Sequence, residues 1–153
     1  MNPISTRQAN ISDLDTIAPM FDAYRQFYGK APDLMGAREF LGERMKLNES
    51  VIFLAFQNEH ESPHAVGFTQ LYPSFSSVSM AKIFVLNDLF VSPSGRGQGV
   101  GTALLSAAAD YAKSVGAIRL NLNTDVQNKA AQSVYEAAGW VRDQQYFMYE
   151  LNL

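Results

Sequence analysis

Glycine fills four of the seven positions from 95 to 101, namely Gly95, Gly97, Gly99 and Gly101. An apolar stretch typical of a strand, residues 82–91, precedes them, and apolar residues at helical spacing follow from 100 to 115. Glycine adopts positive φ and lets a ligand approach the backbone closely. The start of a helix presents unpaired N–H groups and the positive end of the helix dipole. We therefore predict a phosphate-binding turn here, with a plain tight turn as the alternative.

Two common nucleotide-binding patterns do not fit this turn. The dinucleotide pattern G-x-G-x-x-G lacks its third glycine whether counting starts at Gly95 or at Gly97. A P-loop needs Gly-Lys followed by Ser or Thr, and this tripeptide occurs nowhere in the chain. The predicted phosphate ligand therefore belongs to another class.

The remainder of the chain predicts one α+β domain over residues 1–153, with no repeat and no linker. Ser12 is expected to cap the first helix, and Gly29 is expected to end it. Strands are expected at residues 6–9, 51–56, 65–72, 82–91, 118–123 and 146–151, and helices at residues 14–28, from after Pro32 to 47–48, 100–115 and 128–138.

Composition excludes several functions. The chain has no cysteine, so it has no disulfide, thiolate metal site or cysteine nucleophile. With a net charge of −3 and no cluster of Lys and Arg, it lacks the basic face expected of a nucleic-acid-binding protein. The longest apolar run has six residues and the N-terminus lacks a signal-peptide pattern, so we expect a cytoplasmic protein without a membrane partner. His60 and His64 are expected at the surface, and no metal site is predicted.

Two motifs in sequence order identify a resemblance. Arg96-x-x-Gly99-x-Gly101 fits the pattern Arg/Gln-x-x-Gly-x-Gly/Ala between a strand and a helix. A second segment reads Asn-x-x-Ala-x-x-x-Tyr-x-x-x-Gly-Trp, with Asn128, Ala131, Tyr135, Gly139 and Trp140. The chain thus resembles the GNAT superfamily of N-acetyltransferases over residues 4–151, most strongly over 85–141. The family usually has Phe where Trp140 stands, a difference that affects packing.

The resemblance implies a fold and a co-substrate. The fold is the GNAT fold, a central, mixed but mostly antiparallel twisted β-sheet flanked by about four helices. The co-substrate is acetyl-CoA, with its pantetheine arm along the backbone of Leu89, Phe90 and Val91. The residues expected at the pyrophosphate are Arg96, Gly97, Gln98, Gly99, Val100, Gly101 and Thr102, and Asn128, Ala131 and Tyr135 are expected to complete the cofactor site.

Catalytic roles follow from the same resemblance and from the chemistry of acyl transfer. Tyr135 is the candidate proton donor to the departing thiolate, because a phenol with a pKa near 10 suits a thiol leaving group; the alternative is a packing role. A backbone N–H at Leu89 or Phe90 is a candidate oxyanion donor. Residues 85–91 resemble the branch with polyamine, histone and D-amino-acid acetyltransferases, in which diamine enzymes carry glutamate at the position of Asn87. Asn87 cannot accept a proton, which leaves Asp88, water or bulk solvent as base, and Asp88 could equally brace the strand.

The acceptor is expected to be a primary amine of a small molecule or peptide. Five aromatic residues are assigned to its pocket, with a core role as the alternative: Tyr24, Phe27, Tyr28, Tyr72 and Phe75. If no carboxylate removes the amine proton, activity should rise from about pH 7 to about pH 9 and should favour amines of low pKa. Two other functions stay open, a catalytically silent acyl-CoA sensor and a histone-like lysine acetyltransferase. A homodimer also stays open.

Overall fold

The computed structural model describes residues 3–59 and 62–153, which excludes the N-terminal dipeptide, His60 and Glu61. The chain divides into two compact units, Met1–Asn123 and Thr124–Leu153. The first unit contains a sheet and three α-helices. The second contains one α-helix, α4 (Lys129–Ala137), followed by a chain without regular secondary structure.

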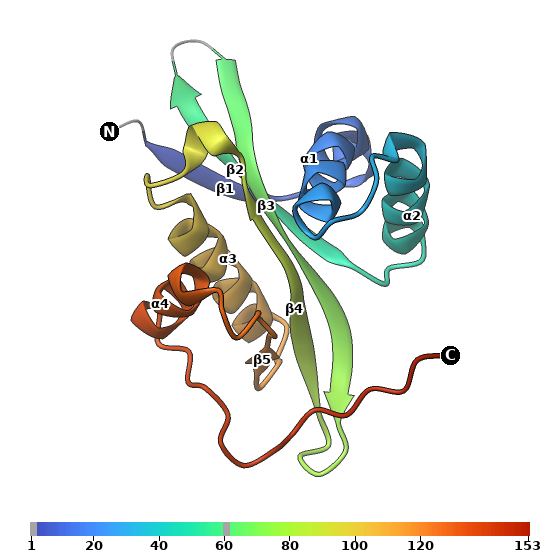
Figure 1. Cartoon of the computed structure of the whole chain (residues 1–153), viewed down its shortest axis with the longest axis vertical. Helices are drawn as coiled ribbons and strands as arrows, with labels where there is room; N and C mark the ends of the chain where they lie inside the picture. The colour runs from blue at the N-terminus through green and yellow to red at the C-terminus, as the bar shows by residue number, and fades with distance from the viewer. Residues whose placement is uncertain (1–2, 60–61) are drawn as a thin grey trace. The chain divides into compact units, whose positions relative to one another are not determined.

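A five-stranded sheet organises the first unit, with the strands in sequence order (Figure 1). Neighbouring strands from β1 to β4 run antiparallel, whereas β4 and β5 run parallel. The sheet is therefore mixed and mostly antiparallel, which confirms the predicted α+β class. The strands are β1 (Ile4–Gln8), β2 (Val51–Glu59), β3 (Ser62–Ser76), β4 (Ala81–Val91) and β5 (Leu120–Asn121).

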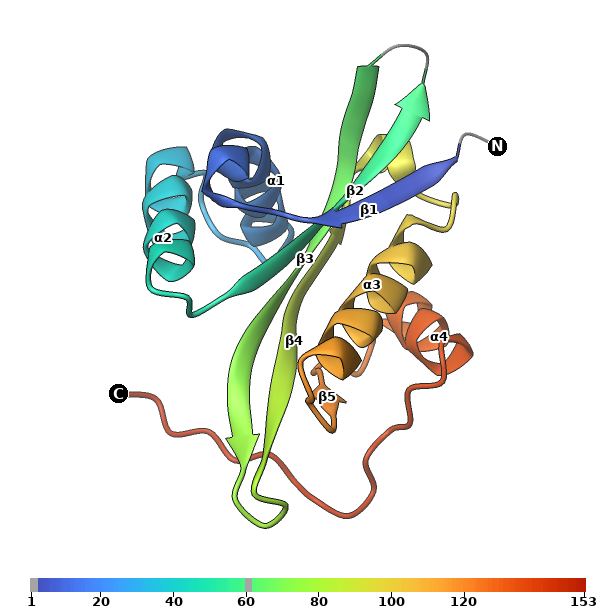
Figure 2. The ribbon, with the colours of Figure 1, turned by 180° about the vertical axis from the view of Figure 1, so that it is seen from behind.

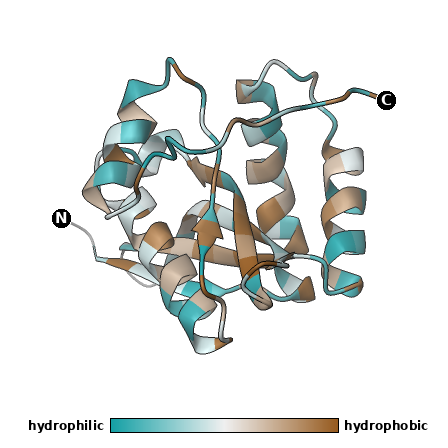
Figure 3. Cartoon of the chain, turned by 90° about the horizontal axis from the view of Figure 1, so that it is seen from below, coloured by the Kyte–Doolittle hydropathy of each residue, from teal (hydrophilic) through white to brown (hydrophobic). Residues whose placement is uncertain are grey.

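Helices cover both faces of this sheet. The helices α1 (Leu14–Phe27) and α2 (Leu34–Lys46) lie on one face, and α3 (Val100–Ser114) lies on the other (Figures 1 and 2). On the first face Ile17, Leu41 and Phe68 belong to one apolar core, and on the second Val66, Val100 and Leu104 belong to another. Figure 3 shows hydrophobic residues along the strands between the helices. None of the helices in the described part of the chain is long and apolar enough to cross a membrane.

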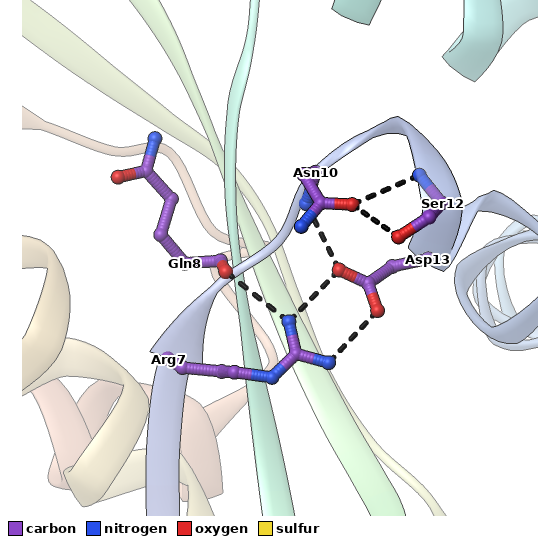
Figure 4. A network of polar contacts seen from close by, with 5 residues as sticks. All are labelled: Arg7, Gln8, Asn10, Ser12 and Asp13. Carbon is purple, nitrogen blue, oxygen red and sulfur yellow. Dashed lines mark hydrogen bonds and ion pairs between the residues drawn. The ribbon is translucent and has the colours of Figure 1, made fainter.

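The junction between β1 and α1 corrects one expectation. Asn10, and not Ser12, caps the short 3₁₀ turn η1 (Ile11–Asp13) that leads into α1 (Figure 4). Its side chain accepts a hydrogen bond from the Ser12 N–H at 2.9 Å, and the Asp13 carboxylate accepts one from the Asn10 N–H at 2.9 Å. Arg7 adds two hydrogen bonds of 2.8 Å to the same carboxylate. This reciprocal cap begins two residues earlier than predicted because Asn10 and Asp13 satisfy each other's backbone donors.

Several expected strand boundaries also differ, and β2 and β3 extend beyond the expected 51–56 and 65–72. Residues 73–76 continue β3 where a loop was expected, and the turn occupies residues 77–80. Pro73 is tolerated because pairing with β2 stops at Leu71, so its missing N–H interrupts no ladder on that side. The strand expected at 118–123 is limited to Leu120–Asn121, although the Ile118 N–H also donates to the Lys82 carbonyl at 3.0 Å.

The strand expected at residues 146–151 is wrong. In the described second unit this segment does not form a strand, although its apolar residues favour one. A strand also needs a neighbouring strand for its backbone groups, and the described residues pair none with this segment. The apolar pattern of the segment alone does not show whether such a neighbouring strand exists.

Candidate active site

A bulge in β4 creates the centre of the candidate site. Gln70 on β3 pairs with Asp88, but its neighbour Leu71 pairs with Leu86, so Asn87 is an extra residue on β4. A bulge bends the strand and redirects the side chains around it. Thr69 fixes one side of the bulge, since its hydroxyl donates to the Asp88 carbonyl at 2.8 Å.

The Asp88 carboxylate is buried between two amides. Its side chain is only 2 % exposed, and it accepts hydrogen bonds from the side-chain amides of Gln70 and of Asn87, the latter at 3.0 Å. Asp88 belongs to none of the ion pairs formed by the described residues. Burial raises the pKa of this carboxyl, while the neighbouring amides and the Tyr24 hydroxyl offset part of the rise.

Sequence reasoning missed the residues behind Asp88. Gln70 is fully buried, and its side-chain oxygen Oε1 accepts a hydrogen bond from the Ser50 hydroxyl at 2.7 Å. This contact directs the Gln70 amide N–H toward Asp88. A polar residue among Phe68, Leu71 and Tyr72 was the available signal, because buried amides require partners.

Tyr24 reaches the same bulge from α1. Its hydroxyl donates to the Asn87 carbonyl at 3.2 Å, and its ring lies 6.1 Å from that of Phe68, centre to centre. Burial and the nearby charge of Asp88 raise the pKa of the Tyr24 phenol well above its usual range. The same two causes, in the same order, raise the pKa of Tyr72. Both phenols are therefore neutral at physiological pH.

The other predicted acceptor residues divide into two groups. Tyr28 and Phe27 extend the aromatic cluster from Tyr24, with ring centres 5.0 Å apart for Tyr24 and Tyr28 and 5.4 Å for Phe27 and Tyr28. Phe75 is three residues beyond Tyr72 on β3, so its side chain points to the opposite face of the strand. The structure thus gathers Tyr24, Tyr28 and Phe27 and does not bring Phe75 to Tyr72.

The glycine-rich turn has the conformation and the free space that a close ligand requires. Gly97 and Gly99 have φ values of +74° and +83°, and a Cβ at either position or at Gly101 would meet no atom within 4 Å. Gly99 is the N-cap of α3 and provides no side-chain capping bond, so the first N–H groups of the helix remain available. Val100 and Thr102 are the first and third residues of this helix.

Gly95 differs from the other three glycines. It is buried at the end of η2 (Pro93–Gly95), where a Cβ would lie 3.0 Å from Val66 and 3.3 Å from Val91. Gly67 is tighter still, because a Cβ there would lie 2.7 Å from the Phe90 carbonyl oxygen. These two glycines allow the turn and α3 to pack closely against β3 and β4.

Polar side chains of the turn contact the strands beside it. The Arg96 guanidinium donates to the Val91 carbonyl at 3.3 Å, and the Gln98 amide donates to the Ser94 carbonyl at 3.0 Å. The side-chain oxygen Oε1 of Gln98 also accepts a hydrogen bond from the side-chain amide of Gln57. Arg96 is exposed, so its charge is available to an anion at the turn.

Among the described residues, the end of β4 next to the turn pairs with a strand on one edge only. Leu89, Phe90 and Val91 pair with β3 on one side. On the other side, the described pairing with β5 involves only Phe84 and Val85. The edge of β4 beyond Val85 can therefore receive an extended ligand by main-chain hydrogen bonds.

The predicted residues of the second motif all lie in the second unit. The Asn128 side chain caps α4 by accepting a hydrogen bond from the Ala131 N–H at 3.1 Å. The ring of Tyr135 lies 6.2 Å from that of Trp140, and its carbonyl accepts a hydrogen bond from the Trp140 N–H at 3.0 Å. Trp140 therefore packs against the candidate proton donor, as a Phe at that position would.

A separate opening of about 430 Å³ lies on the α1 side of the sheet. None of the five predicted acceptor residues lines it. His64 is exposed there, whereas His60 lies outside the described residues. Within the described part of the chain, no group of three or more His, Asp or Glu side chains is placed to hold a metal ion. The lining residues are Thr16, Met20, Phe56, Pro63, His64, Ala65 and Ser92.

Comparison with known proteins agrees with this geometry. The model of the acetyltransferase (GNAT) family matches residues 17–140. A Bacillus subtilis (strain 168) protein described as "Uncharacterized N-acetyltransferase YhfO" is 49% identical over 150 residues, which is 98% of each chain. A "Probable acetyltransferase" from Haemophilus influenzae is 32% identical over 92% of each chain. A crystal structure of a probable acetyltransferase superposes with a TM-score of 0.91 at 40% identity, covering 97% of both chains.

Proposed function

Because the chain belongs to the GNAT family of acetyltransferases, we propose that it transfers the acetyl group of acetyl-CoA to a primary amine of a small molecule or peptide. The amine attacks the thioester directly while both substrates are bound. The conformation of the glycine turn is the observation that carries this proposal.

Three features of the first unit suit CoA. Gly97, Gly99 and Gly101 leave open space at the start of an uncapped helix, and such a helix start binds pyrophosphate through backbone N–H groups. Exposed Arg96 adds a positive charge beside it. The free edge of β4 at Leu89 to Val91 can pair with the amide groups of a pantetheine arm.

The chemistry requires a neutral amine, a polarised carbonyl and a proton for the thiolate. A backbone N–H at Leu89 or Phe90 can polarise the carbonyl. Tyr135 can protonate the leaving sulfur, as the family resemblance implies. Asp88 is the carboxylate available to accept the amine proton, since Asn87 cannot do so.

The proposal is tested first by CoA binding. Gly101→Glu and Gly101→Gln place side chains of equal size into the same open space, and only the first adds a charge. The glutamate variant should bind CoA at least about tenfold more weakly than the glutamine variant, because like charges about 4 Å apart repel by about 4 kcal/mol near a surface. Gly101→Ala should retain binding. Calorimetry giving equal affinities for the Glu and Gln variants would exclude the phosphate cradle.

A second candidate function, a silent acyl-CoA sensor, is favoured by Asn87 at the position where diamine acetyltransferases carry glutamate. A screen of amines with acetyl-CoA, followed by release of free thiol, separates the two. Binding of acetyl-CoA without amine-dependent thiol release would favour the sensor. Release that requires peptide lysines would favour the histone-like alternative.

A further inference from the structure

The buried position of Asp88 raises a problem for any amine that must lose a proton to it. Asp88 is 2 % exposed, and its two carboxylate oxygens accept hydrogen bonds from the side-chain amides of Gln70, which is buried, and of Asn87, which is exposed. An acceptor ammonium at the surface of the first unit cannot touch this carboxylate without displacing those groups. A proton therefore needs an intermediate group to reach it.

Tyr24 lies between the exposed aromatic residues at the end of α1 and the bulge that contains Asp88. Its hydroxyl is held at the bulge by the 3.2 Å hydrogen bond to the Asn87 carbonyl, and it lies close enough to Asp88 for each group to shift the pKa of the other. On its other side, Tyr28 packs edge-on against the Tyr24 ring, and Tyr28 is 57 % exposed. The aromatic cluster thus runs from the exposed Tyr28 through partly buried Tyr24 to the buried carboxylate.

We propose that Tyr24 is a further catalytic residue, whose hydroxyl accepts the proton of the acceptor ammonium while passing its own proton to the Asp88 carboxylate. The N–H bond of the ammonium breaks and a new O–H bond forms on Tyr24. The Tyr24 hydroxyl, which donates to the Asn87 carbonyl in this structure, turns to the carboxylate of the next residue for this step. Its former O–H bond then breaks and an O–H bond forms on Asp88, which leaves a neutral amine and a neutral acid. This inference rests on the proposed acetyl transfer to amines, and the proton returns to solvent after transfer.

The groups around Asp88 suit this role. The raised pKa of Tyr24 prevents loss of the phenolic proton to solvent, so the hydroxyl can donate and accept in one concerted movement. The raised pKa of Asp88 makes it a stronger proton acceptor than an ordinary aspartate. Tyr72 and Gln70 of β3 and Asn87 of β4 also face this carboxylate, and the charge of Arg44 of α2 lowers the pKa of Tyr72.

The test compares Tyr24→Phe with the wild type across amines of graded pKa. For lysine-like amines with a pKa near 10.4, kcat/KM at pH 7 should fall by about 10²–10⁴-fold. For α-amino groups with a pKa near 8 the loss should be much smaller, because about a tenth of the amine is already neutral at pH 7. The loss for lysine-like amines should also shrink as the pH rises toward 9.

Tyr111→Phe is the matched control. Tyr111 lies on α3, where its ring packs 5.6 Å from Phe53 and 5.7 Å from Phe84, away from the bulge. This variant should keep wild-type kcat/KM for every amine. Calorimetry with CoA and thermal unfolding of both variants verify that binding and folding are intact.

Two results would overturn the inference. A loss in Tyr24→Phe of equal size for all amines and all pH values would assign Tyr24 to packing alone, and so would wild-type kinetics. A wild-type protein that binds acetyl-CoA yet acetylates no amine would instead contradict the proposed function, so the two failures are distinguishable.

Discussion

The side-chain amide of Gln70 donates a hydrogen bond to the carboxylate of Asp88, and both residues are buried. The two residues are register partners in β3 and β4, directly beside the bulge at Asn87. Ser50 fixes the orientation of the amide by donating to its oxygen. Two neutral amides, those of Gln70 and Asn87, thus hold a buried carboxylate that belongs to no ion pair among the described residues.

Gln70→Leu should therefore affect both stability and the pH profile. Removing the donor leaves the buried carboxylate with one partner fewer, which should lower the free energy of unfolding by about 1–3 kcal/mol. The pKa of Asp88 should rise further, so the acidic limb of kcat/KM should move to higher pH. Ser50→Ala, which keeps the amide and removes only its orienting partner, should show a smaller change of the same sign. If the acidic limb of the kcat/KM profile of Gln70→Leu stays at the wild-type pH, Asp88 does not take part in catalysis.

Asp88 and Asp13 should influence the pH dependence of stability with opposite signs. The pKa of Asp88 is raised by burial, so its contribution to stability is present at low pH and is lost as the pH rises through its folded pKa. The pKa of Asp13 is lowered chiefly by its hydrogen bonds with Arg7, so its contribution is present above about pH 4 and is lost as the pH falls through its folded pKa.

Urea unfolding of Asp88→Asn and Asp13→Asn from pH 3 to pH 8 measures this contrast. The free energy of unfolding of Asp88→Asn should improve relative to wild type as the pH rises. Asp13→Asn should be destabilised at neutral pH and should approach wild type in acid. If the free energy of unfolding of either variant changes with pH in parallel with that of the wild type, the pKa shift of the substituted residue is contradicted.

Much of the fold could be predicted from periodicity and turn residues. The helix ends at Phe27 and Ser114 lie within a residue or two of the expected ones, because Gly29 and Gly116 adopt the positive φ that ends a helix. The cap at Asn10 was missed because two overlapping polar patterns compete there. The strand expected at 146–151 was wrong because pairing depends on a partner that local sequence does not specify.

The candidate site was predictable only in part. The glycine turn follows from residue type, since positive φ and open space are what Gly97 and Gly99 provide. The bulge at Asn87 depends on the register between two strands, and the partnership of Gln70 with Asp88 depends on that bulge. Neither the bulge nor this hydrogen-bond partnership could be predicted from the sequence of one strand alone. Phe75 was assigned to the acceptor pocket together with Tyr72 from the family resemblance, although strand alternation separates them.

Alanine substitutions at Gly67 and Gly101 should have different effects on stability, because Gly67 is required for close packing and Gly101 lies in open space where a ligand can approach. Gly67→Ala should destabilise the protein by about 1–3 kcal/mol, because the new Cβ would overlap the Phe90 carbonyl oxygen. Gly101→Ala lies in open space within the first turn of α3 and should leave stability unchanged or raise it by up to about 1 kcal/mol. Denaturant unfolding of both variants checks this. Equal stabilities would mean that the backbone around Gly67 relaxes freely.

Tyr135→Phe tests the role assigned to the second unit. If the hydroxyl protonates the leaving thiolate, it is needed when charge develops on sulfur, so kcat should fall while the affinity for acetyl-CoA changes little. A proton donor typically contributes about 10²–10⁴-fold. The contact between the rings of Tyr135 and Trp140 survives the substitution, so the variant should fold normally. Tyr146→Phe, an exposed position in the same unit, is the matched control and should keep wild-type kcat. Single-turnover measurements would establish that chemistry limits the rate, and wild-type turnover of Tyr135→Phe under that condition would leave Tyr135 with a packing role against Trp140.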